Sequence, residues 1–176
     1  MSISQNTKIE NLKVEYRINP IGIDNLVPRF SWNMVSNERG QHQTAYQLLI
    51  ATSKELLTPE TVDVWNSGLI LSDKSVGIKY GGKTLSPSTR YYWKMIIWDK
   101  NNNPIHSTSD NFFETGLRSD DGITGWDGAK WISMNNRNIE SSGAPMFRKV
   151  TKLSGRVKTA RLYISSLGAY KVYING

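Results

Sequence analysis

Residues 77–84 carry the spacing of a nucleotide-binding loop. They read GIKYGGKT and fit the pattern G-x-x-x-x-G-K-T, in which backbone N–H groups and the lysine hold phosphates. That chemistry requires a strand before the loop and a helix that opens at the Lys-Thr pair. Here the predicted strand Val76 to Tyr80 overlaps the loop itself, and Pro87 opposes a helix after it. We therefore interpret the segment as a short strand and a Gly-Gly turn, and we expect no nucleotide or other cofactor.

The carboxylates do not form a pair that spacing could assign to glycoside hydrolysis, which needs two carboxyl groups that flank a pocket. Most acidic residues stand singly in predicted turns, namely Asp24, Glu38, Asp73, Asp99 and Asp110. The adjacent pair Asp120 and Asp121 lies in a glycine-rich stretch. A G-x-S-x-G nucleophile elbow is absent, and neither His42 nor His106 has an adjacent Ser or Asp partner. We therefore assign no catalytic residue.

Metal chemistry finds equally little support in the residue types. The sequence has no cysteine, which excludes a disulfide framework, a thiolate zinc site and a cysteine nucleophile. Its two histidines are isolated. Asp99 with Asn101 to Asn103 supplies oxygen ligands, but the spacing and the bidentate glutamate of a calcium loop are missing. The interpretation is a hairpin turn, and we assign no metal site.

Aromatic side chains are the remaining candidates for binding. Tyr92 and Trp98 share the outer face of the central predicted strand, Trp65 lies near a strand end, and Trp126 and Trp131 stand in or beside a linker. They could stack on sugar rings as a small lectin-like surface. They could equally pack against a neighbouring domain, which large exposed aromatic patches usually mark. We therefore predict these five residues as glycan or domain-interface contacts, and favour the interface.

The stretch Arg90–Lys100, RYYWKMIIWDK, is the element that must position these aromatics. Tyr91, Trp93, Met95 and Ile97 alternate with the rest, which predicts a strand with one wholly apolar face. The opposite face carries a single charge, so it is expected to be partly covered as well.

A tyrosine corner is predicted just before this strand. Residues 85–91 read LSPSTRY, in which Pro87 and Ser88 turn the chain and Tyr91 can return its hydroxyl to the backbone of the corner. The spacing resembles the fibronectin type III pattern. Seven short strands with turn signals between them indicate an all-β fold, a fibronectin type III-like or immunoglobulin-like β-sandwich over residues 8–117. We expect them at 8–16, 29–34, 45–52, 64–68, 76–80, 90–100 and 111–115.

A second region follows a glycine-rich linker, which we place at 118–143. Apolar alternation resumes at 146–153, 160–164 and 170–174, and the sequence stops at Asn175-Gly176, a strong hairpin signal. We expect residues 144–176 to be the first strands of a second, truncated β-sandwich.

The net charge of +7 lies in this second region. Residues 141–176 hold seven Lys or Arg and no acid, whereas the rest sums to zero. The basic residues are dispersed along predicted strands, so we favour an incomplete domain over a nucleic-acid-binding tail, and expect no nucleic-acid partner. Three strands cannot bury their own inner face, which predicts a homodimer through residues 145–176.

Location follows only in part from the sequence. No apolar run reaches the roughly 18 residues of a membrane span, and the first residues lack the features of a signal peptide. The protein is expected to be cytoplasmic, or periplasmic or secreted if a signal peptide has been left off.

Several motifs in one order resemble the N-terminal, non-catalytic region of bacterial α-L-rhamnosidases, glycoside hydrolase family 78. In the first region the matching pieces are VEYRINPIGID at 14–24, PRFSW at 28–32, QTAYQ at 43–47, VWNSG at 64–68, YYWK at 91–94 with Trp98-Asp99, FETG at 113–116, and Trp126 with Trp131-Ile132. In the second they are APMFRK at 144–149, ARLYISSLGAY at 160–170 and YING at 173–176.

The resemblance implies a fibronectin-like sandwich followed by a jelly-roll-like one. It further implies that terminal α-L-rhamnose is hydrolysed, with inversion, in a later (α/α)6 barrel with acidic catalytic residues. No position here corresponds to that barrel. The chain is then an accessory fragment that braces the catalytic domain or orients the enzyme on polysaccharide. The alternative is a free-standing carbohydrate-binding or adhesion module.

Overall fold

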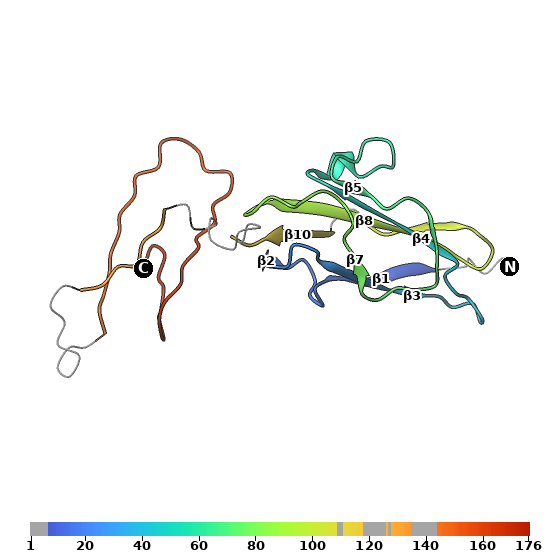
Figure 1. Ribbon diagram of the computed structural model, residues 1–176, viewed down its shortest axis with the longest axis horizontal. Helices are drawn as coiled ribbons and strands as arrows, with labels where there is room; N and C mark the ends of the chain where they lie inside the picture. Colours follow the sequence, from blue (N-terminus) through green and yellow to red (C-terminus); the bar gives the residue numbers. More distant parts are fainter. Residues whose placement is uncertain (1–6, 109–110, 118–125, 127, 135–143) are drawn as a thin grey trace. The chain divides into compact units, whose positions relative to one another are not determined.

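The structure is a computed structural model that describes residues 7–108, 111–117, 126, 128–134 and 144–176. It divides into two compact units, Met1–Ala129 and Lys130–Gly176. The first unit holds all the strands of the described residues, arranged as two facing sheets (Figure 1).

The smaller sheet has three antiparallel strands in the order β1-β3-β7. Their bounds are Lys8–Val14 for β1, Arg29–Val35 for β3 and Ile78–Lys79 for β7. The larger sheet has the order β2-β10-β8-β4-β5, with β6 on β4 and β9 on β8. Its strands are β2 (Ile21–Ile23), β4 (Ala45–Ala51), β5 (Trp65–Asn66), β6 (Ile70–Leu71), β8 (Arg90–Trp98), β9 (Pro104–His106) and β10 (Asn111–Thr115).

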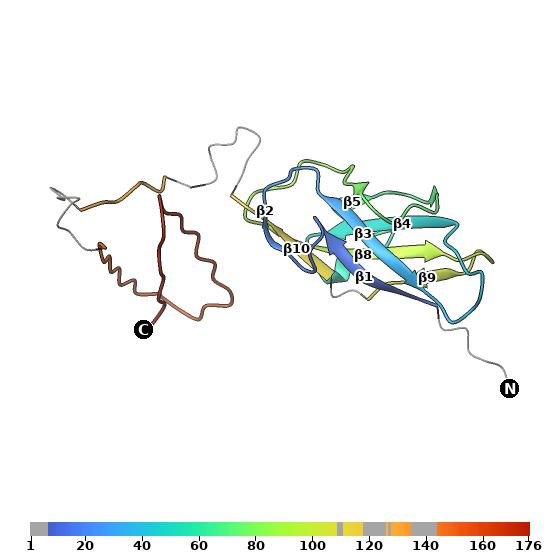
Figure 2. The same ribbon diagram turned by 90° about the horizontal axis from the view of Figure 1, so that it is seen from below.

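Strand β8 lies between β4 and β10, and Figure 2 shows it in the middle of its sheet. Its alternate residues Tyr91, Trp93, Met95 and Ile97 are buried between the sheets, which confirms the predicted inner face. The Phe30 ring of the facing sheet meets the Trp93 ring edge-on, with centroids 5.0 Å apart. The all-β sandwich predicted from this strand is confirmed.

The tyrosine corner is confirmed as well. The backbone N–H of Ser86 donates to the Tyr91 hydroxyl at 2.8 Å, so the ring is buried while its oxygen holds the corner. Ser88, at the bend, has φ of 49°. This contact fixes where β8 begins.

We expect Tyr91→Phe to lower the free energy of unfolding of the first unit by about 1–2 kcal/mol, because the N–H of Ser86 loses its acceptor. Urea unfolding followed by circular dichroism measures the difference. A midpoint equal to that of the unchanged protein would show that the hydroxyl contributes nothing. Tyr16→Phe is the matched control, since this tyrosine is exposed.

Three short strands were not predicted. The crossing after β1 contains β2, which runs parallel to β10. Strands β6 and β9 add two- and three-residue pairings to β4 and β8. Each is too short to show a period of two, so the sequence carried no signal for them.

The strands predicted within 144–176 do not form. In the described residues beyond Leu117 no strand is assigned, and apolar side chains such as Met146 and Leu167 are exposed. The physical reason is the one that made the region look incomplete, since three strands alone lack a cover for their apolar face. Asn175 and Gly176 have φ of 63° and 108°, the sign that a type I′ hairpin turn requires. The domain bounds and the homodimer stay predictions.

Candidate functional site

Tyr92 and Trp98 lie on the same outer face of β8, six positions apart along the strand, and the chain itself covers part of that face. Both are half-buried and pack against a second apolar cluster. The cover is the β4–β5 connection with its 3-10 turn η1 (Lys54–Leu56), and the cluster contains Leu49, Ala51, Leu56, Leu57, Val62 and Ile96. The expected partial cover of this face is therefore present. Contact of either ring with a glycan or another domain stays a prediction.

Trp65 belongs to a different place. It is half-buried at the edge of the main core, where its ring meets the Tyr80 ring edge-on at 5.1 Å. The Tyr80 hydroxyl donates to the carbonyl of Lys83 at 2.6 Å, and burial raises the pKa of Tyr80 to about 12. A Cβ at Gly82 would lie 2.7 Å from the Trp65 Cβ, which explains the glycine there. Trp65 supports the turn after β7, and it does not share a surface with Tyr92.

Trp126 and Trp131, predicted as glycan or domain-interface contacts, are 44% and 69% exposed. They fall in different compact units, Trp126 in the first and Trp131 in the second. The backbone carbonyl of Trp126 accepts a hydrogen bond from the N–H of Ala129 at 2.8 Å. Contact of either tryptophan with a glycan or another domain stays a prediction.

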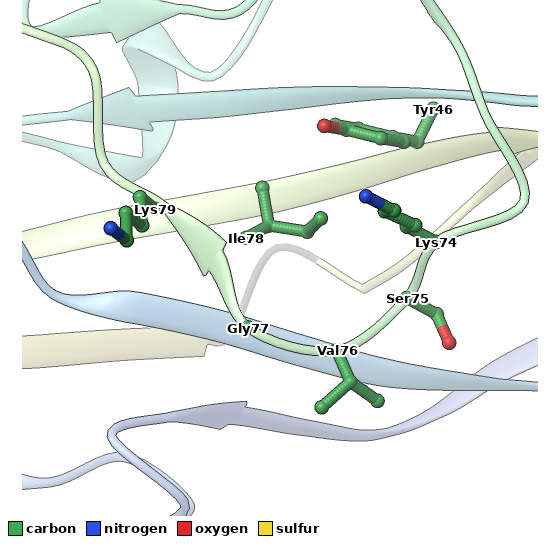
Figure 3. Close-up of a pocket in the computed structure, with 7 residues that line it drawn as sticks. All are labelled: Tyr46, Lys74, Ser75, Val76, Gly77, Ile78 and Lys79. Carbon is green, nitrogen blue, oxygen red and sulfur yellow. The ribbon is translucent and has the colours of Figure 1, made fainter.

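An unpredicted pocket opens beside the edge strand β7. It is lined by Tyr46 of β4 and by residues 74–79 (Figure 3). The segment is held by β3 and by the β3–β4 connection: Trp32 donates its backbone N–H to the carbonyl of Ser75 at 3.0 Å, and the Gln43 side chain donates to the carbonyl of Lys74 at 3.1 Å. Tyr46 and Lys74 are 28 positions apart in the sequence, so no local pattern linked them.

The loop with nucleotide-binding spacing lacks the context that phosphate binding needs. Strand β7 lies inside it, and the described residues after Thr84 contain no helix before β8. Leu85 is buried instead. The segment is a strand followed by a turn, as interpreted from the sequence.

Several carboxylates of the first unit have structural partners. Glu15 accepts from the backbone and guanidinium of Arg29, whose hydrogen bond lowers the pKa of Glu15. Glu114 pairs with Arg90 at 3.2 Å. Of the two carboxylates in the hollow at 33–43, Glu38 is ion-paired with Lys100 and Asp73 is exposed. Neither is a buried general acid.

Metal ligands and membrane-spanning helices are two further features to consider in the part of the chain that the structure describes. Within it, no three His, Cys, Asp or Glu side chains gather as a metal site would require. Within the same residues, no helix has the length and apolar character to cross a bilayer.

Comparison with known proteins identifies the fold and the family. Residues 9–119 match the family described as Rha78A-like, N-terminal immunoglobulin domain. An α-L-rhamnosidase of Formosa agariphila is 34% identical over 178 residues, which cover 90% of this chain and 18% of that protein. An α-L-rhamnosidase of Streptomyces avermitilis is 34% identical over 190 residues, which cover 96% of this chain and 18% of that protein. The chain thus spans about a fifth of the length of the curated relatives it matches.

Solved structures agree. The α-L-rhamnosidase from Dictyoglumus thermophilum has a TM-score of 0.60 and 39% identity, covering 65% of this chain and 13% of that one. The Streptomyces avermitilis α-L-rhamnosidase complexed with L-rhamnose has a TM-score of 0.59 and 38% identity, and the match covers 64% of this chain and 11% of that one. The chain therefore belongs to the Rha78A-like family, and its residues 9–119 are the N-terminal immunoglobulin domain of that family.

Proposed function

We propose that this chain is an accessory, non-catalytic N-terminal part of an α-L-rhamnosidase, and that its first unit braces or orients the catalytic part. The observation that carries the proposal is the coverage. The match takes in 90% or more of the chain but only about 18% of each of the two α-L-rhamnosidases described above. Hydrolysis of terminal α-L-rhamnose would then belong to an (α/α)6 domain of the same enzyme, which would be the partner of this chain.

The geometry of the first unit is consistent with support rather than catalysis. The Glu15–Arg29 and Glu114–Arg90 pairs connect residues 14 and 24 positions apart along the chain, and Arg90 also lies over the Phe112 ring at 4.3 Å. Such contacts stiffen the end of the sandwich where β10 leads to Gly116. A rigid module at this point could hold a following domain in place.

We expect the purified chain not to hydrolyse p-nitrophenyl α-L-rhamnoside. The carboxylates in the described part of the first unit are ion-paired, hydrogen-bonded or exposed, and none forms a pair across an apolar pocket. Release of p-nitrophenol, followed by absorbance, is the measurement. Turnover above buffer that disappears when one Asp or Glu is replaced would overturn the proposal.

A deletion experiment can distinguish bracing from orienting. It uses the longer protein that the proposal requires, which would be encoded by the same reading frame as this chain. Deletion of residues 1–117 should lower its melting temperature if the domain is a brace. If the domain orients the enzyme, deletion should leave that temperature unchanged and reduce activity on polysaccharide but not on the small substrate. A deletion that changes none of these would refute both roles.

A further inference from the structure

The pocket beside β7 is lined by one tyrosine, Tyr46 of β4. Tyr46 is 6% exposed, and its ring packs edge-on against Trp32 with centroids 5.4 Å apart. Its hydroxyl has no hydrogen-bond partner among the described residues. Burial raises the pKa of Tyr46, so at neutral pH the phenol keeps its proton and can donate.

Positive charge lies beside this hydroxyl. Lys74 and Lys79 both line the pocket, and neither ammonium group has an ion pair within the described part of the chain. Figure 3 shows the side chains of Lys74 and Ile78 pointing toward Tyr46, whereas Val76 points away. The pocket itself contains no acidic residue; Asp73, the nearest acid in the sequence, lines the separate hollow at 33–43.

The pocket is preorganised by the hydrogen bonds that hold residues 72–75. Gln43 is buried, accepts from the Trp32 indole N–H at 2.8 Å, and donates to the carbonyls of Ser72 and Lys74 at 2.9 and 3.1 Å. A ligand would therefore meet a backbone held in place at residues 72–75, together with one hydroxyl donor, the exposed ammonium group of Lys74 and the apolar side chain of Ile78. Sugars carry both hydroxyl groups and an apolar C–H face, and an acidic sugar adds the anion.

We propose that this pocket binds an acidic sugar residue of a polysaccharide, with its carboxylate or sulfate at Lys74, a ring hydroxyl at Tyr46 and its C–H face over Ile78. Lys79, at the far end of the lining, would attract the anion of a neighbouring residue. The proposal concerns a ligand of this chain alone and does not depend on a bracing role.

The test is a titration of the ¹⁵N-labelled 176-residue chain at low salt with three probes: trigalacturonate, the neutral trisaccharide galactotriose, and inorganic phosphate. We expect trigalacturonate to shift the amide signals of Tyr46 and residues 74–79 saturably, and to bind about ten-fold more tightly than galactotriose. Phosphate, which lacks the sugar ring, should bind more weakly than trigalacturonate.

Two variants test the assignment. Lys74→Ala should weaken trigalacturonate binding about ten-fold, the scale of one charge-assisted hydrogen bond. Tyr46→Phe keeps the ring against Trp32 and should weaken trigalacturonate binding about five-fold, as loss of one neutral hydrogen bond does. Lys8→Ala, which removes the same charge from the Lys8–Glu10 pair on β1, should change the affinity less than two-fold. Unchanged signals elsewhere show that each variant is folded.

Each other outcome counts against the proposal. The site would be overturned if the amide signals of these residues showed no saturable shifts. It would also be overturned if Lys74→Ala and Tyr46→Phe both bound trigalacturonate as tightly as the unchanged protein does. Equal binding of galactotriose would overturn the acidic class, and equal binding of phosphate would reduce the pocket to a simple anion site. None of these results would bear on the rhamnosidase proposal, which is judged by activity of the longer protein.

Discussion

Replacement of Trp93 by alanine should lower the free energy of unfolding of the first unit by about 3–5 kcal/mol, the cost of removing a large aromatic from a closed core. Trp93 is 1% exposed and sits opposite Ile50 of β4 in the register of the larger sheet. Its ring meets Phe30 across the sandwich. A loss of this size removes a large part of the stability of a small domain.

The measurement is urea unfolding followed by far-ultraviolet circular dichroism, because tryptophan fluorescence would change with the residue itself. Trp131→Ala is the matched control: this tryptophan is 69% exposed, and the expected change is below about 0.5 kcal/mol. A loss below about 1.5 kcal/mol for Trp93→Ala, with an unchanged slope, would mean that the two sheets do not close over this ring.

Trp93→Phe distinguishes packing from the indole N–H. The Nε1 atom of Trp93 is buried without a hydrogen-bond partner among the described residues. Phenylalanine removes this unsatisfied donor but leaves a small void, and the two effects oppose each other. We expect a net loss below about 1.5 kcal/mol, well under that of alanine.

The inner faces of the long strands were predictable from the sequence because burial between two sheets imposes a period of two. Tyr91 to Ile97 showed that period, and the corner chemistry of Pro87 and Ser88 placed the start of the strand. The outer face was harder to predict, since the cover of Tyr92 and Trp98 comes from the β4–β5 connection, whose apolar residues have no matching period.

The pocket beside β7 shows what local patterns cannot reveal. It depends on Tyr46 from one sheet and on a loop held against the other sheet, and hydrogen bonds of Gln43 set their relative position. The expectation of strands within 144–176 illustrates the opposite case, in which a local pattern is present but no strand is found. Their alternation is a local signal, but a strand forms only when another element covers its apolar face.

Asp99 should be the most important carboxylate for stability, and we expect Asp99→Ala to lower the free energy of unfolding by about 2–3 kcal/mol. The residue is 4% exposed and closes the turn between β8 and β9. Its Oδ1 accepts the backbone N–H groups of Asn101 and Asn103, both at 2.8 Å. Its Oδ2 accepts the side-chain amides of Asn103 at 3.2 Å and Gln41 at 3.3 Å. Alanine leaves these four donors without their acceptor.

The same contacts make the contribution depend on pH. Burial alone would raise the pKa of Asp99, but the hydrogen bonds from Asn103, Asn101 and Gln41 outweigh it and hold the pKa below its ordinary value. A carboxyl group whose pKa is lower in the folded state stabilises the fold above the unfolded value, about 3.9. That stability is lost as the pH falls through the folded pKa, where the carboxylate takes up its proton.

Asp99→Asn isolates this effect, because the amide keeps one oxygen acceptor but cannot ionise. We expect the stability difference between the unchanged protein and Asp99→Asn to be largest at pH 7, still present at pH 5, and to shrink below about pH 4. Asp73→Asn is the matched control, since its exposed carboxylate accepts no hydrogen bond from the described residues. Comparing the two variants by urea unfolding at each pH cancels the titration of Glu15, Asp63 and the other acids. A difference for Asp99→Asn that is the same at pH 7 and pH 3 would show that the turn depends on the shape of the side chain and not on its charge.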